Sequence, residues 1–283
     1  MWNIARCFCV LPQKEKNTLK PGPSRINCAA LLLGALLLPQ VKGEQWSKHW
    51  SVGPKPELRI HAGDAAVVVQ AENMDGIDAT LTTRGWSIGR TGVQVTEHQN
   101  GNSVDIDIKV PPTHFSFGDH SIKLEVRVPR ELTGDIHTGD GSIKLLGLHG
   151  SVRADTGDGS IQGQDLDGTF EAHTGDGSVH VAGRFDRLQL HTQDGSVELN
   201  VQHGSRLQEG WRVETGDGSV RVNLPRDLAA DLELRTGDGH LRVDLPLSVE
   251  VMKSDHELRG KLNGGGPTLV VHTGDGSISI GAA

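Results

Sequence analysis

The chain has 283 residues, of which 37 are glycine and only 4% are aromatic, with no tyrosine. Glycine has nearly twice its usual share of ~7%, and the core must be filled with Val, Ile, Leu and Ala, which favours a turn-rich β architecture over large helices. The formal net charge of −8 argues against nucleic acid and anionic lipid as partners, because a negative surface repels both.

Residues 1–43 have the features of a signal peptide. The apolar run 26–38 has 13 residues, which suits the central region of a signal peptide and is short for a membrane span. We expect cleavage near Gly43 and export to the periplasm or the cell surface; the alternative is an uncleaved segment, the only membrane contact that the sequence predicts. A chain cut at this point loses all of its cysteines, which are Cys7, Cys9 and Cys28.

Residues 44–127 form an irregular β region in this interpretation, which covers one open end of the fold. The region contains one degenerate copy of the repeat described next, His61-Ala62-Gly63-Asp64-Ala65-Ala66-Val67. Four tryptophans remain after cleavage, and we expect them in the core, with stacking on a sugar as the alternative. They are Trp46, Trp50, Trp86 and Trp211.

Residues 128–283 contain seven copies of a motif close to Thr-Gly-Asp-Gly-Ser-Ile. The copies are His137–Ile143, Asp155–Ile161, His173–Val179, His191–Val197, Glu214–Val220, Arg235–Leu241 and His272–Ile278. Their central aspartates are spaced by 18, 18, 18, 23, 21 and 37 residues. The last gap is close to two periods, so a decayed copy around Ser254-Asp255-His256 is expected to fill it.

Each period predicts two strands and two turns, because apolar residues alternate on both sides of every motif. An Asp-Gly pair favours turn geometry with positive φ, and the aspartate side chain can accept nearby backbone N–H groups. We predict an all-β fold, a β-solenoid resembling a single-stranded β-helix with coils of ~18 residues and an inward ladder of threonines. An antiparallel meander or sandwich is the alternative.

The repeated aspartates are the candidate cation ligands. They are Asp140, Asp158, Asp176, Asp194, Asp217, Asp238 and Asp275. Glycine-aspartate β-rolls bind Ca²⁺ in their turns, but those carry aspartate at both turns of a coil, whereas one turn carries it here. We therefore favour turn formation, with no metal and no cofactor, and keep Ca²⁺ as the alternative.

The residue before each motif threonine is expected to face solvent. It is histidine in four copies, His137, His173, His191 and His272, and is replaced by an acid or arginine in the others. No known catalytic motif is present, and the acids follow the repeat where an active site would break it, so we predict that the chain is not an enzyme.

Several segments resemble one bacterial family. They are the T-G-D-G ladder, Trp46-Ser-Lys-His-Trp-Ser-Val-Gly, Val128-Pro129-Arg130, Leu224-Pro225-Arg226 and the stretch from Gly264 to Ile278. Together they make residues 44–283 similar to the DUF4097 family, whose members are described as candidate adhesins. The resemblance implies a solenoid-like fold and supplies no catalytic residues.

The sequence therefore predicts an exported, non-catalytic repeat protein. It is expected to act as an adhesin or as a binding or scaffold module of the cell envelope, with a protein or polysaccharide of the envelope or surface as its ligand. The alternatives are a calcium-binding β-roll and a polysaccharide-active β-helix enzyme.

Overall fold

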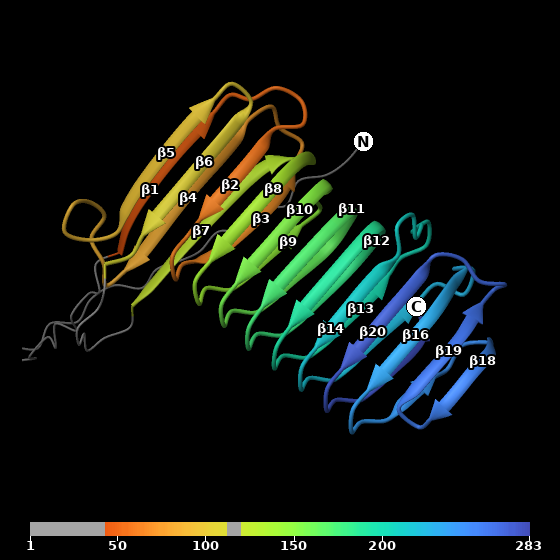
Figure 1. The fold of residues 1–283 in the computed structure, drawn as a ribbon. Coiled ribbons are helices and arrows are strands. Elements are labelled where there is room, and N and C mark those ends of the chain that lie inside the picture. The colour runs from red at the N-terminus through yellow and green to blue at the C-terminus, as the bar shows by residue number, and fades with distance from the viewer. Residues whose placement is uncertain (1–42, 112–119) are drawn as a thin grey trace, which may run out of the picture. The chain divides into compact units, whose positions relative to one another are not determined.

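The computed structural model describes residues 43–111 and 120–283, and these consist of strands and connecting turns (Figure 1). The chain divides into residues 1–40 and a second unit, 41–283. The predicted signal peptide, residues 1–43, lies outside the described residues except for Gly43, as do all three cysteines. The described part of the chain has no helix that could cross a membrane.

The strands fall into three groups along the chain. The first group is β1 (Gly43–Trp50), β2 (Glu57–His61), β3 (Ala66–Glu72), β4 (Ile77–Arg84), β5 (Gln94–Asn100), β6 (Ser103–Lys109) and β7 (Ser121–Pro129). The second is β8 (Glu131–Thr138), β9 (Ile143–Leu146), β10 (His149–Thr156), β11 (Ile161–Thr174), β12 (Val179–Thr192), β13 (Val197–Val201), β14 (Trp211–Thr215) and β15 (Val220–Leu224). The third is β16 (Ala230–Thr236), β17 (Leu241–Val243), β18 (Leu247–Ser254), β19 (Glu257–Leu262), β20 (Thr268–Thr273) and β21 (Ile278–Ala282).

The strands stack in two layers that enclose an aliphatic core. The first layer runs β5, β6, β2, β8, β10, the second halves of β11 and β12, β14, β20, β16, β19 and β18. The second runs β1, β4, β7, β3, β9, the first halves of β11 and β12, β13, β15, β21 and β17. Each T-G-D-G turn joins a first-layer strand to a second-layer strand, and this unit is called a coil and named by its aspartate. Neighbouring coils pair in parallel, so the fold is the predicted β-solenoid and not the antiparallel meander.

The coils do not stack in chain order. The Asp275 coil lies between the Asp217 and Asp238 coils, because β20 pairs with both β14 and β16. The prediction of a decayed copy around Asp255 is therefore wrong: Ser254 and Glu257 are paired across a turn that joins the antiparallel strands β18 and β19. The degenerate copy at Asp64 is confirmed as a coil, which stacks on the Asp140 coil.

Antiparallel strands cover the ends of the parallel stacks. At one end β5 pairs with β6, and β4 with β1 and β7. At the other end β19 pairs with β16, and β18 with β19 (Figure 1). These strands occupy most of the edges of the parallel stacks, where another copy of the chain could otherwise pair.

Each of the seven T-G-D-G coils has a buried threonine, as predicted, and this threonine links the coil to its neighbour. The threonine ladder consists of Thr138, Thr156, Thr174, Thr192, Thr215, Thr236 and Thr273. Each hydroxyl reaches a carbonyl oxygen of the neighbouring coil; Thr174 Oγ1, for example, donates to Gly159 O at 2.9 Å. Since a buried polar group needs a partner, the ladder fixes the register between coils.

The glycines of the turn are required for a reason different from the predicted one. None of the T-G-D-G glycines, nor the aspartate between them, has positive φ. Instead, a Cβ at the second glycine would lie 2.0 Å from a carbonyl oxygen of the neighbouring coil, as Gly159 shows against Gly141 O. The turns stack so closely that a side chain there would collide with the next backbone.

Candidate functional site

The turn aspartates form an exposed column along one edge of the solenoid. In spatial order they are Asp64, Asp140, Asp158, Asp176, Asp194, Asp217, Asp275 and Asp238. Within residues 43–111 and 120–283 no hydrogen bond or ion pair involves the side chains of the seven candidates, so the expected capping of backbone N–H groups is not made. The same ranges hold no group of three or more His, Cys, Asp or Glu residues arranged for a metal ion.

The first layer carries an ordered row of acidic and basic residues on its outer face, beside the aspartate column. This acid–base row is Asp107, His61, His137, Asp155, His173, His191, Glu214, His272, Arg235 and Glu257. An acid stands at every third position of this row, and two basic residues lie between successive acids. The order is not visible in the sequence, because the coils do not stack in chain order. The histidines face outward as predicted.

Contacts within the acid–base row are loose. His173 Nδ1 lies 4.0 Å from Asp155 Oδ1, and His191 Nδ1 lies 4.0 Å from Glu214 Oε2. The rings of His173 and His191 are 6.0 Å apart. Such exposed pairs contribute little to stability, so the row is a surface pattern more than a structural brace.

A second row lies two residues earlier on the same strands. This arginine row is Asp105, Arg59, Asp135, Arg153, Glu171, Gln189, Arg212, Val270, Glu233 and Arg259. Acids and arginines alternate along it, and Arg259 Nη2 donates to Glu233 Oε1 at 2.8 Å. The hydrogen bond from Arg153 to Asp155, helped by the charge of the same carboxylate, raises the pKa of Arg153.

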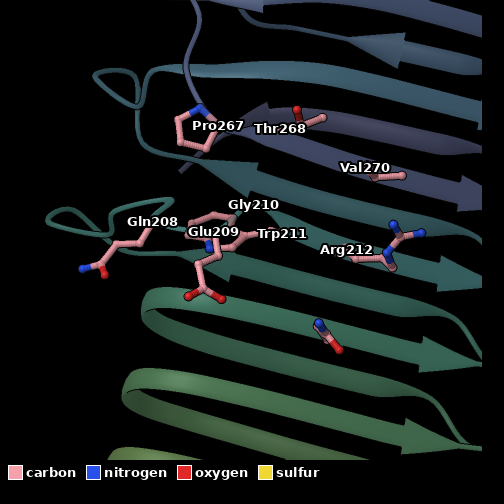
Figure 2. Close-up of a pocket in the computed structure, with 9 residues that line it drawn as sticks. Gln208, Glu209, Gly210, Trp211, Arg212, Pro267, Thr268 and Val270 are labelled. Carbon is pink, nitrogen blue, oxygen red and sulfur yellow. The ribbon is translucent and has the colours of Figure 1, made fainter.

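The alternation of the arginine row is interrupted from Gln189 to Val270, where two neutral side chains lie on either side of Arg212. A pocket of about 500 Å³ opens at this place (Figure 2). Its lining is Gln189, Gln208, Glu209, Gly210, Trp211, Arg212, Pro267, Thr268 and Val270. These residues come from β12, β14 and β20, and from the loops that precede β14 and β20.

Two departures from the repeat create the pocket. The loop 202–210 lengthens the spacing between Asp194 and Asp217 to 23 residues and is held to the coil before it by Arg206 N, which donates to Phe185 O at 3.0 Å. The inserted last coil supplies the opposite wall. Gly210, the last residue of the loop, lies close to this opposite wall: its φ is +86°, and a Cβ there would lie 2.9 Å from Thr268 O.

Trp211 lines the pocket and also belongs to the core. It is 1% exposed, and its ring packs edge-on against Phe185 with the centroids 6.3 Å apart. Its indole Nε1 is buried and has no hydrogen-bond partner within residues 43–111 and 120–283. A buried donor without an acceptor is rare in folded proteins.

The charged groups of the pocket are already paired. Glu209 Oε2 accepts a hydrogen bond from Arg187 Nη1 at 3.0 Å, and Arg212 Nη1 donates to Glu214 Oε1 at 2.7 Å. The pocket therefore presents neutral groups, the amide of Gln189 and the hydroxyl of Thr268 among them. It can bind uncharged polar molecules by hydrogen bonding.

The Toastrack DUF4097 family model matches residues 56–281. The chain belongs to this family. The match spans the described solenoid almost from end to end and bears out the resemblance carried by the T-G-D-G turns. No curated protein matches the chain.

Three solved structures similar to this DUF4097 chain are remote in sequence. A candidate adhesin from Parabacteroides merdae is 8% identical, with 84% of this chain and 96% of that chain covered and a TM-score of 0.43. A candidate adhesin from Bacteroides fragilis is 12% identical, with 84% and 97% covered and a TM-score of 0.37. A candidate lipid-binding protein from Parabacteroides distasonis is 12% identical, with 83% and 96% covered and a TM-score of 0.39.

Sequence reasoning placed the aspartates and histidines of this DUF4097 chain on its surface but missed the pocket. Trp211 was expected in the core, and it is buried there. The pocket needs β20 beside β14, whereas chain order puts β16 there. One available signal was the five extra residues of the loop 202–210, the longest interruption between consecutive copies before the final gap.

Proposed function

We propose that this chain is an exported, non-catalytic binding or scaffold module of the cell envelope, and that it meets its partner with the outer face of the first layer. The observation that carries the proposal is the ordered surface itself. Two rows of acidic and basic residues cross ten strands in register, and the pocket lies where one of them is interrupted by Gln189 and Val270. A regular lattice with a local interruption suits recognition of an extended ligand.

The chemistry of the pocket supports binding over catalysis. Hydrolysis of a glycosidic bond generally needs two carboxyl groups, one on each side of the bond, roughly 5–10 Å apart. Glu209 is the one carboxylate of the described lining, and it is paired with Arg187. The aspartates of the turns repeat from coil to coil, which is what a structural element does.

The apolar run 26–38 supports export, because its length suits a signal peptide. In the proposal, cleavage near Gly43 releases a chain without cysteine, which can work in an oxidising compartment with no thiol to protect. Adhesion to a surface polysaccharide or protein is the finer form of the proposal, in keeping with the description of its family.

One experiment tests export, binding and the absence of catalysis together. A Gram-negative host expresses the full chain with a C-terminal epitope tag, and the purified protein is then incubated with immobilised envelope polysaccharide. We expect the tag in the periplasmic or surface fraction at the mass of a chain cut near residue 43, saturable retention on the polysaccharide, and no released fragments. Cytoplasmic retention, or the appearance of new reducing ends, would overturn the proposal.

A further inference from the structure

We propose that the pocket between β12, β14 and β20 binds a neutral saccharide, and that the indole N–H of Trp211 donates a hydrogen bond to one of its oxygens. This inference rests on the proposed binding function and names its ligand class. It starts from Trp211, which lines the pocket and whose buried Nε1 has no hydrogen-bond partner among the described residues.

Trp211 is held in place by its packing in the core. Phe185 contacts the ring edge-on, at an interplanar angle of 87°, and the residue is 1% exposed. The ring therefore cannot turn to stack flat on a ligand without leaving the core. Its N–H can still donate to an acceptor that enters the pocket, and a sugar hydroxyl or ring oxygen is such an acceptor.

The charge balance of the pocket selects a neutral ligand. Arg187 neutralises Glu209, and Glu214 neutralises Arg212, so neither an anion nor a cation gains an unpaired partner. The chain also carries a net charge of −8, which disfavours anionic ligands further. What remains is an amide at Gln189 and a hydroxyl at Thr268, groups that both donate and accept.

The surroundings of the pocket disfavour a peptide. An extended peptide usually adds to a free sheet edge, but β14 is paired on both sides, by β12 and by β20. A helical peptide needs a row of apolar contacts, and Val270 and Pro267 are the aliphatic side chains that the described lining offers. A ligand rich in hydroxyl groups satisfies this mixture of amide, hydroxyl and indole N–H better.

The backbone keeps the pocket open. Position 210 precedes Trp211, and a Cβ there would lie 2.9 Å from Thr268 O on the opposite wall of the pocket. Glycine leaves space there, and its φ of +86° makes any side chain at this position strained. The space is therefore built into the fold and does not depend on the movement of a flexible side chain.

The test follows the indole N–H directly. Protein purified after export of the full chain is labelled with ¹⁵N, and its indole resonances are recorded while maltose, cellobiose or N,N′-diacetylchitobiose is added up to about 20 mM, a range that detects millimolar affinity. The Trp211 resonance is assigned by its absence in Trp211→Phe. We expect it to shift saturably with at least one disaccharide, while the other indole resonances stay in place.

Two variants separate the pocket from the fold. Trp211→Phe keeps a ring against Phe185 and removes the donor, so affinity for the active disaccharide should fall about fivefold to tenfold, the effect of one hydrogen bond. Gln189→Ala should weaken binding similarly, and it keeps the test valid if Trp211→Phe does not fold. Gln70→Ala, an exposed glutamine of β3 in the second layer, should bind like the unchanged protein.

Three results would overturn the inference. One is the absence of any shift of the Trp211 resonance with all three disaccharides. Another is a shift with glucuronate or with a capped alanine peptide but with no neutral sugar. A third is retention of Trp211→Phe and Gln189→Ala on envelope polysaccharide as strong as that of the unchanged protein, which would refute the role of the pocket but not the proposed binding function. If instead neither the unchanged protein nor the variants are retained on the polysaccharide, while the unchanged protein still binds a disaccharide, the proposed binding function is refuted and the pocket is not.

Discussion

Replacing Thr174 by valine removes one hydroxyl from the threonine ladder and keeps nearly the same shape. Thr174 Oγ1 donates to Gly159 O at 2.9 Å and lies 3.2 Å from Gly157 O. Gly157 O also accepts from the Gly175 backbone N–H, whereas the buried Gly159 carbonyl has no other donor among the described residues. The variant therefore leaves a buried acceptor unpaired, at a cost of about 1–3 kcal/mol.

The assay is thermal unfolding of Thr174→Val beside two matched variants. For a unit of this size the expected loss corresponds to a fall in Tm of roughly 2–10 °C. Thr169→Val, on the outer face of the same strand β11, should change stability by no more than about 0.5 kcal/mol. Thr174→Ser, which keeps the hydroxyl, should lose less than Thr174→Val. Equal Tm values for the two valine variants would refute the role given to the ladder.

Three further outcomes follow from the turns and from the order of the coils. Gly159→Ala should lower the free energy of unfolding by about 3 kcal/mol or more, since the new Cβ would lie 2.0 Å from Gly141 O; a denaturation midpoint close to that of the unchanged protein would contradict the close stacking. Deleting 267–283 should make 225–266 sensitive to limited proteolysis, because the deleted coil pairs with β16; retained protection would show that the coil is not inserted. Asp176→Asn should raise Tm slightly, more at low salt, by removing one charge from the aspartate column, and Ca²⁺ and EDTA should give the same Tm; a large rise with Ca²⁺ would instead favour the calcium-binding alternative.

The sequence predicted the strands and turn of each coil well, because they depend on residues that are close together in the chain. Alternation of apolar residues with period two, followed by a turn motif, fixes two strands and their buried faces without reference to distant residues. Burial of the motif threonines follows from the same alternation, and Thr156 and Thr174 are buried as expected. The aspartates, two residues after each threonine, are exposed because the strand has ended there and they lie in the turn.

The order of the coils could not be derived in that way. Every coil offers nearly the same stacking surface. The motif alone therefore allows either the Asp238 coil or the Asp275 coil to stack on the Asp217 coil. The choice is made by the hairpin of β18 and β19, which occupies the other side of β16 and leaves β20 to insert beside β14. The pocket was hidden for this reason, since its walls come from coils that are not consecutive.

The reason predicted for the glycines of the turn was wrong, because the positive φ expected there is absent. Asp-Gly is common where φ is positive, and that preference led to the expectation for Asp158 and Gly159. In a solenoid the same glycine answers a different constraint, the approach of the Gly141 carbonyl from the next coil. A single sequence does not distinguish a glycine kept for its backbone angle from one kept for the absence of its side chain.

The binding pocket exists only if the last coil lies between the Asp217 and Asp238 coils, and disulfide trapping measures this most directly. Arg221 is paired with Ser279, and Ser279 with Arg242, on the adjacent strands β15, β21 and β17. Adjacent strands lie ~4.8 Å apart, within the Cα separation that a disulfide spans, while strands two apart do not. In protein purified after export, Arg221→Cys with Ser279→Cys should form a disulfide under mild oxidation and Arg221→Cys with Arg242→Cys should not; the reverse result would mean that the coils stack in chain order and that the pocket is not formed.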